Sequence, residues 1–154
     1  MTEPQGGADP RVFTTRAVRD GDDWVITGRK YFSSNASVAS FFIVVAITDP
    51  DVPVHRGAST FLVPAGTPGL VIEATHHLAG AHPHEPGHSL VRYDEVRVPA
   101  DALLGEPGQG FMILQTRLAA AGYTTRCAPS GWPARHRHDG AAREKPFHPG
   151  QFTG

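Results

Sequence analysis

An aromatic ring two residues before a serine hydroxyl is the feature of this sequence best suited to chemistry. The pair is Phe32 and Ser34, with Ser33 between them, near the end of the stretch TGRKYFSSNA (27–36). The flat ring can cover the face of a planar heteroaromatic cofactor while the hydroxyl hydrogen-bonds its edge. Ser-Ser-Asn is also common turn chemistry, so the alternative is an ordinary strand that ends in a polar turn. Taken alone, the short motif favours that turn.

Histidines crowd a second stretch of the chain. Five of them share residues 76–88 with one glutamate: His76, His77, His82, His84, His88 and Glu85. Imidazole and carboxylate groups are zinc ligands, so His84, His88 and Glu85 are candidates for a metal site. Pro83, Pro86 and Gly87 would break the helix needed to set both histidines on one face. We therefore predict a loop here and no physiological metal site.

Short strands separated by glycine- and proline-rich turns must position these residues. Predicted strands cover residues 12–19, 24–32, 41–47, 60–64, 70–74 and 89–98. The turn DGDD (20–23) predicts a hairpin, and the run FFIVVAI (41–47) predicts a buried central strand. Trp24, Phe41 and Phe42 are expected to belong to the core. This pattern predicts a mainly β fold, an antiparallel barrel or sandwich.

The pattern changes after the last predicted strand. Residues 1–110 are expected to form the β-domain, and 111–121 the start of a C-terminal helix. Residues 122–154 have no apolar periodicity and hold five basic side chains against two acidic ones. We expect this tail to be disordered.

Composition excludes several classes of protein. A chain of 154 residues with 40% apolar content is long enough for one domain with a real core. The net charge of −1 gives no case for binding nucleic acid or an anionic membrane surface. The single Cys127 excludes an intramolecular disulfide and a multi-cysteine zinc site. No apolar run approaches membrane-spanning length and no signal peptide opens the chain, so we expect a soluble, cytoplasmic protein.

Five motifs in register over residues 1–118 resemble the acyl-CoA dehydrogenase family, specifically its middle β-domain. They are MTEP (1–4), GDDWVITGRKYFSS (21–34), TPG (67–69), VRVP (96–99) and GEPGQGF (105–111). Ser33-Ser34, His84 to His88 and QTRL (115–118) are similar to the branch near family members 10 and 11.

The resemblance implies an FAD cofactor at the opening motif. Phe32 occupies the place of the family's aromatic residue against the isoalloxazine ring, and Ser34 the place that hydrogen-bonds near flavin N5, with Ser33 between them. Thr2 matches the threonine at the pyrimidine edge, and Met1 contributes backbone. Such contacts tune the electronics of the ring.

The resemblance also implies an acyl-CoA thioester substrate. The family's Gly-Ser-Asp reads Gly7-Ala8-Asp9 here, so Ala8 is expected to offer the substrate backbone contacts only. Family members of fatty acid metabolism dehydrogenate the α,β-bond: a carboxylate base removes the α-proton while hydride passes to flavin N5. That base, the adenine half of the FAD site and the homo-oligomer contacts belong to helical domains that this sequence does not contain.

Two functional hypotheses follow. The first is a fragment of a flavin-dependent acyl-CoA dehydrogenase, itself inactive and without a catalytic residue. The alternative is a non-catalytic remnant or interaction module with a β-barrel fold.

A frameshift is one explanation of the tail. GC-rich codons for residues 121–128, read two bases later, encode Arg-Ile-His-His-Ala-Met-Arg, which resembles the family's next helix. We hypothesise a one-base deletion near Ala120. An intact genomic reading frame that encodes the same tail in related strains would contradict this hypothesis.

Overall fold

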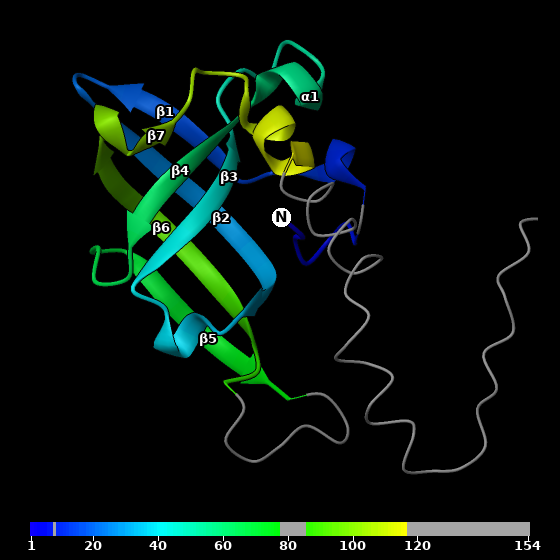
Figure 1. Ribbon diagram of the computed structural model, residues 1–154, viewed down its shortest axis with the longest axis vertical. Coiled ribbons are helices and arrows are strands. Elements are labelled where there is room, and N and C mark those ends of the chain that lie inside the picture. Colours follow the sequence, from blue (N-terminus) through cyan, green and yellow to red (C-terminus); the bar gives the residue numbers. More distant parts are fainter. Residues whose placement is uncertain (8, 78–85, 117–154) are drawn as a thin grey trace, which may run out of the picture. The chain divides into compact units, whose positions relative to one another are not determined.

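The computed structural model describes residues 1–7, 9–77 and 86–116 (Figure 1), and Met1–Thr116 form one compact unit. The predictions for Ala8, for His82, His84 and Glu85, and for the tail lie outside the described residues.

One sheet of seven strands organises this unit. The strands are β1 Arg16–Asp20, β2 Asp23–Ser34, β3 Phe41–Ile47, β4 Ala58–Pro64, β5 Leu70–His76, β6 His88–Pro99 and β7 Leu103–Leu104. Short helical turns connect them: η1 Pro10–Val12, η2 Ala36–Val38, α1 Val54–Gly57 and η3 Ala100–Ala102. A helix also occupies residues 110–116, next to the predicted helix start at 111. No helix in the described ranges is long and apolar enough to cross a membrane.

The strand order is β5-β6-β2-β1-β3-β4-β7, which confirms the mainly β fold. The sheet does not close into a barrel, since β5 and β7 lie at its two ends. Neighbouring strands are antiparallel with one exception: β1 and β3 pair in parallel through Arg16 and Ile47. The exception has a topological cause. After β2, the chain crosses to the far side of β1 and reverses, so β3 runs antiparallel to β2 and parallel to β1.

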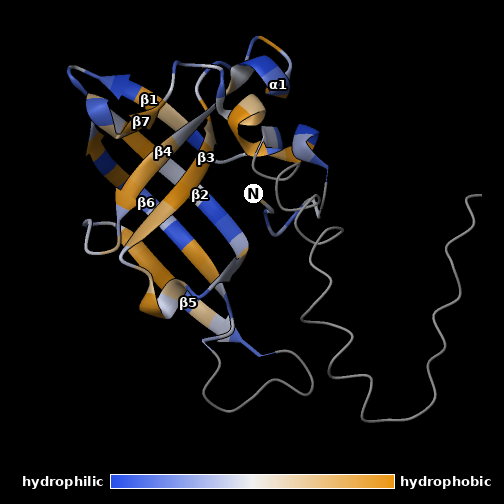
Figure 2. Cartoon of the chain, viewed as in Figure 1, coloured by the Kyte–Doolittle hydropathy of each residue, from blue (hydrophilic) through white to orange (hydrophobic). Residues whose placement is uncertain are grey.

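The main core lies on one face of the sheet, and Figure 2 shows apolar residues along β3, β4 and β6. A second, smaller cluster of Val45, Ala58 and Leu114 lies on the other face of β3, because Val45 alternates with the core residues on either side of it. Trp24 and Phe61 meet edge to face, with ring centroids 5.4 Å apart. Trp24 and Phe42 are buried as predicted. The prediction for Phe41 is wrong: Phe41 is 55% exposed and Ile43 51% exposed. Side chains alternate between the faces of a strand, and only one face of β3 is covered at this end.

The start of β1 also differs from the prediction. Residues 12–15 precede the strand, because η1 ends at Val12 and Phe13 leads out of that turn. The side chain of Asp9 caps η1 by accepting a hydrogen bond from the backbone N–H of Arg11. The chain therefore turns before it enters the sheet at Arg16.

Candidate functional site

A β-bulge in β2 presents the predicted aromatic residue. In the ladder between β2 and β6, Lys30 lies opposite Val91 and Ser33 opposite Ser89, so β2 holds one extra residue at Tyr31 and Phe32. Phe32 has a φ of 59°, a left-handed conformation that aromatic residues rarely adopt. Strained backbone of this kind clusters at functional sites. The bulge thus interrupts the alternation of side chains between the two faces of the sheet at Phe32.

The Phe32 ring is stacked on one side and open on the other. Its centroid lies 4.0 Å from that of Tyr31, with 28° between the ring planes. Phe32 is nevertheless 54% exposed, so its second face is available to a ligand. The edge of His76 meets Tyr31 at a centroid distance of 5.7 Å. Sequence reasoning did not assign Tyr31 a role, although its position beside Phe32 was a signal.

The predicted hydroxyl lies at the end of the same strand and has a histidine partner. Ser34 is exposed, and its Oγ lies 2.9 Å from Nδ1 of His88. The register pairs Ser34 with His88 and His88 with His76, so these three residues form a row across β2, β6 and β5. Ser33, as the neighbouring strand residue, points to the opposite face. Sequence reasoning considered His88 only as a metal ligand.

The N-terminal segment lies beside the bulge. The backbone N–H of Tyr31 donates to the carbonyl oxygen of Thr2 over 2.9 Å. The Nζ of Lys30 donates to the carbonyl oxygen of Met1 over 3.2 Å. The structure therefore brings Met1 and Thr2 next to the segment that carries Phe32, although about 30 residues separate them in sequence.

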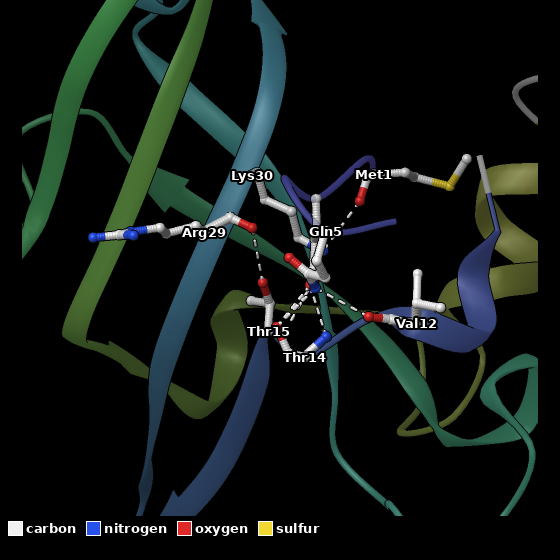
Figure 3. A network of polar contacts seen from close by, with 8 residues as sticks. Met1, Gln5, Val12, Thr14, Thr15, Arg29 and Lys30 are labelled. Carbon is white, nitrogen blue, oxygen red and sulfur yellow. Dashed lines mark hydrogen bonds and ion pairs between the residues drawn. The ribbon is translucent and has the colours of Figure 1, made fainter. Parts of the chain in front are cut away.

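A buried ion pair holds the N-terminal segment in place (Figure 3). The Nζ of Lys30 lies 2.7 Å from Oε1 of Glu3, and the two residues are 4% and 1% exposed. Oε1 also accepts the backbone N–H of Thr15 over 3.1 Å. Oε2 accepts the backbone N–H of Thr14 over 2.6 Å, its hydroxyl over 2.9 Å, and Nε2 of Gln5 over 2.7 Å. Both carboxylate oxygens are thus fully engaged.

This environment keeps the carboxylate charged. Burial alone would raise the pKa of Glu3, but hydrogen bonds from Lys30 and Thr14 and the charge of Lys30 outweigh it and lower the pKa to about 2. Burial lowers the pKa of Lys30, and the hydrogen bond and charge of Glu3 partly offset that effect. The ammonium group also lies 4.4 Å from the ring centroid of Phe13. Sequence reasoning missed this pair, because nothing local links residue 3 to residue 30.

Gly28 allows the close strand approach on which the network depends. A Cβ at this position would lie 2.4 Å from Oγ1 and 2.6 Å from Cα of Thr15. Any side chain on residue 28 would therefore push Thr15 away from β2. Thr15 donates one of the hydrogen bonds to Glu3, so the glycine contributes indirectly to the position of the N-terminal segment.

A groove of about 380 Å³ lies away from Phe32 and Ser34. Its lining includes Gln5, Thr14, Gly28, Arg29, Arg92 and Tyr93. Both arginines already pair with Glu73, and Arg92 also pairs with Asp94. The groove therefore offers no uncompensated charge from these arginines to a ligand. Within the described residues, no three His, Cys, Asp or Glu side chains gather closely enough to hold a metal ion.

Comparison with known proteins gives a consistent result. Residues 1–96 match the family model described as "Acyl-CoA dehydrogenase, middle domain". "Probable acyl-CoA dehydrogenase FadE2" of Mycobacterium tuberculosis is 43% identical over 121 residues, covering 77% of this chain and 30% of that protein. Cyclohexane-1-carbonyl-CoA dehydrogenase of Syntrophus aciditrophicus is 39% identical over 113 residues, covering 73% of this chain and 29% of that protein.

A solved structure supports the same comparison. The acyl-CoA dehydrogenase from Geobacillus kaustophilus superposes with a TM-score of 0.69 at 37% identity, covering 77% of this chain and 31% of that one. This chain spans less than a third of the length of the relatives named here.

Proposed function

This chain belongs to the acyl-CoA dehydrogenase family, and on that premise we propose that its sheet forms the flavin-facing wall of an acyl-CoA dehydrogenase site. The observation that carries the proposal is the bulge at Tyr31 and Phe32. It places an open aromatic face and the Ser34 hydroxyl on one strand end, beside the backbone of Thr2.

These residues fit an isoalloxazine ring. The open face of Phe32 offers a flat apolar surface, and Tyr31 supports that ring from behind. The exposed hydroxyl of Ser34 can reach a polar ring edge, as donor or as acceptor. The backbone of Met1 and Thr2 is held beside them by Lys30 and Tyr31. Bound FAD would supply the hydride-accepting chemistry.

The family membership supports an acyl-CoA thioester as the substrate class, without specifying the acyl group. We propose α,β-dehydrogenation as the reaction of the intact protein. Relatives carry names as different as short-chain acyl-CoA dehydrogenase and cyclohexane-1-carbonyl-CoA dehydrogenase, so the family alone does not select an acyl group. Backbone contact at Ala8 stays a prediction for this substrate.

We propose that the chain alone does not turn over substrate. Glu3 is the one buried carboxylate among the described residues, and its two oxygens are occupied by Lys30, Thr14, Thr15 and Gln5. A carboxylate with a pKa of about 2 and no free lone pair facing a ligand is a poor general base. Glu3 therefore contributes to the fold and is not a candidate for the carboxylate base of this reaction.

FAD binding tests the proposed wall. Titration of the full chain with FAD, followed by flavin fluorescence and the visible spectrum, should show saturable binding. Phe32→Ala should weaken binding roughly two- to tenfold, since a stacked aromatic contact is worth about 0.5–1.5 kcal/mol. Phe41→Ala is the matched control, because Phe41 is as exposed as Phe32 but lies on β3. An unchanged flavin spectrum would instead favour the interaction module.

A turnover assay tests the inactivity. With an acyl-CoA and an artificial electron acceptor, we expect no turnover by this chain. Turnover that Ser34→Ala or Phe32→Ala abolishes would contradict that expectation and make the chain an enzyme.

The interaction-module alternative has one observation in its favour. Phe41 and Ile43 of β3 are half exposed, and Leu62, which lies opposite Ile43 on β4, is 38% exposed. An apolar strip of this kind often contacts a partner surface.

Four finer assignments are also proposals. Ser33-Ser34 and QTRL (115–118) favour the branch near family members 10 and 11, which a phylogeny of full-length genes would test. A homo-oligomeric intact protein and a cytoplasmic location follow from the family resemblance and the composition, and light scattering and cell fractionation would test them. Sequencing the locus tests the frameshift.

A further inference from the structure

The hydrogen bond between Ser34 and His88 joins the proposed flavin wall to a titratable group. It spans 2.9 Å from Oγ to Nδ1 and links the last residue of β2 to the first residue of β6. His88 is half-buried, and Ser34 is exposed. The hydroxyl therefore has one partner within the sheet and one side open to a ligand.

The proton on His88 decides the direction of this hydrogen bond. A serine hydroxyl has one proton to donate and two lone pairs to accept with. When Nδ1 lacks a proton, Ser34 donates to it and can only accept from a ligand. When Nδ1 carries a proton, it donates to Oγ and the hydroxyl proton is free for a ligand. An imidazolium ring carries protons on both nitrogens, which imposes the second arrangement.

We propose that His88 is a positioning residue that selects whether Ser34 donates to, or accepts from, the edge of a bound flavin. The inference rests on the proposed function, since it assigns the ligand to FAD. Oxidised flavin has an unprotonated N5, which accepts a hydrogen bond. When the neutral ring of His88 carries its proton on Nε2, protonation of Nδ1 frees the Ser34 proton for that acceptor and strengthens the binding of oxidised FAD.

Other titratable side chains surround His88 in the described part of the chain. His76 lies opposite it on β5, and the ring of Tyr31 from β2 meets His76 edge-on. His77 follows in the connection after β5. A test must therefore separate the Ser34–His88 pair from these neighbours.

The test is the affinity of the full chain for oxidised FAD at about pH 5.5 and about pH 8.5, which bracket imidazole titration. The wild-type chain should bind roughly three- to tenfold more tightly at the lower pH, the worth of about one hydrogen bond. Ser34→Ala and His88→Ala should each remove the pH dependence. His77→Ala is the matched control and should keep it.

Ser34→Ala also separates the proposed mechanism from a simple charge effect, because His88 keeps its charge in that variant. A pH dependence that survives Ser34→Ala, or that survives His88→Ala, would overturn the inference. Equal wild-type affinities at both pH values would overturn it too, while FAD binding itself would still support the proposed function.

A complete absence of FAD binding would refute the proposed function and, with it, the flavin part of the inference. The pair itself is then judged by ¹⁵N NMR of the histidine rings. Ser34→Ala should change the Nδ1 resonance of His88 and leave that of His77 unchanged. An unaltered His88 resonance would overturn the coupling between the two side chains.

Discussion

Replacing Glu3 by glutamine should destabilise the fold more than the substitution of an exposed charged residue does. Glutamine keeps the shape of the side chain but removes the charge that faces Lys30, 2.7 Å away. The ammonium group of Lys30 would then be buried without a counter-charge, and at 4% exposure it has little access to water. Removing one partner of a buried pair is far more damaging than removing both.

The size of the effect follows from the pKa of Glu3. A shift from 4.5 to about 2 corresponds to about 3 kcal/mol of stabilisation by the charged carboxylate. Lys30 works against this contribution, because burial lowers its own pKa. The ion pair therefore stabilises the fold by less than the pKa shift of Glu3 alone implies. Glu3→Gln should nevertheless lower the free energy of unfolding by about 3–5 kcal/mol, because it leaves the ammonium group of Lys30 buried without a partner.

The sign of the pH dependence is also determined. The folded-state pKa of Glu3 is lowered, so its contribution is present above about pH 4.5 and is lost as the pH falls towards 2. The difference between wild type and Glu3→Gln should therefore be largest at neutral pH and shrink in acid.

Urea unfolding followed by circular dichroism measures both quantities. The double variant Glu3→Gln/Lys30→Met should be more stable than Glu3→Gln, because it removes the unpaired ammonium. Asp20→Asn, which breaks an exposed pair with Arg97, should leave the stability unchanged within error. A Glu3→Gln variant within about 1 kcal/mol of wild type, or a difference that stays constant down to pH 2, would refute the reasoning.

Two further predictions concern the sheet. Gly28→Ala should destabilise the chain by about 1–3 kcal/mol, because the added Cβ would lie 2.6 Å from Cα of Thr15. Gly66→Ala is its control, since nothing lies within 4 Å of a Cβ there; a comparable loss in both variants would contradict the steric cause. We expect the chain to self-associate through the apolar side chains of Phe41 and Ile43, which are both more than half exposed, so Phe41→Ser combined with Ile43→Thr should reduce self-association in light scattering. Unchanged self-association would mean that a different surface of the chain mediates it.

The strands were predictable because their signal is local. The prediction for residues 41–47 has the bounds of β3, and the other five predicted strands agree with β1, β2, β4, β5 and β6 within two residues at one end or both. The two-residue strand β7 was not predicted. The covered face of β3 was not predictable, since an apolar run looks the same whether one or both faces are buried. Phe41 was therefore assigned to the core and lies at the surface.

The site was predictable only in part. The types and spacing of Phe32 and Ser34 are local signals, and they predict a candidate cofactor site at this strand end. The contact between Ser34 and His88 joins residues 54 positions apart, and Glu3 and Lys30 are 27 apart. Such pairs depend on sheet register and on a bulge, and a single sequence specifies neither in a readable pattern.

These sequence separations also predict the order in which the contacts form during folding. The hydrogen bonds of Glu3 to Thr14 and Thr15 close loops of 11 and 12 residues, and the β1–β2 hairpin turns at residues 21 and 22. Shorter loops close at a smaller entropic cost and faster, so the segment from Glu3 to Ser34 should assemble early in folding. His88 can join only after β6 has docked on β2. During folding, the strand end that carries Phe32 and Ser34 would therefore form first, and the hydrogen bond from Ser34 to His88 would form later.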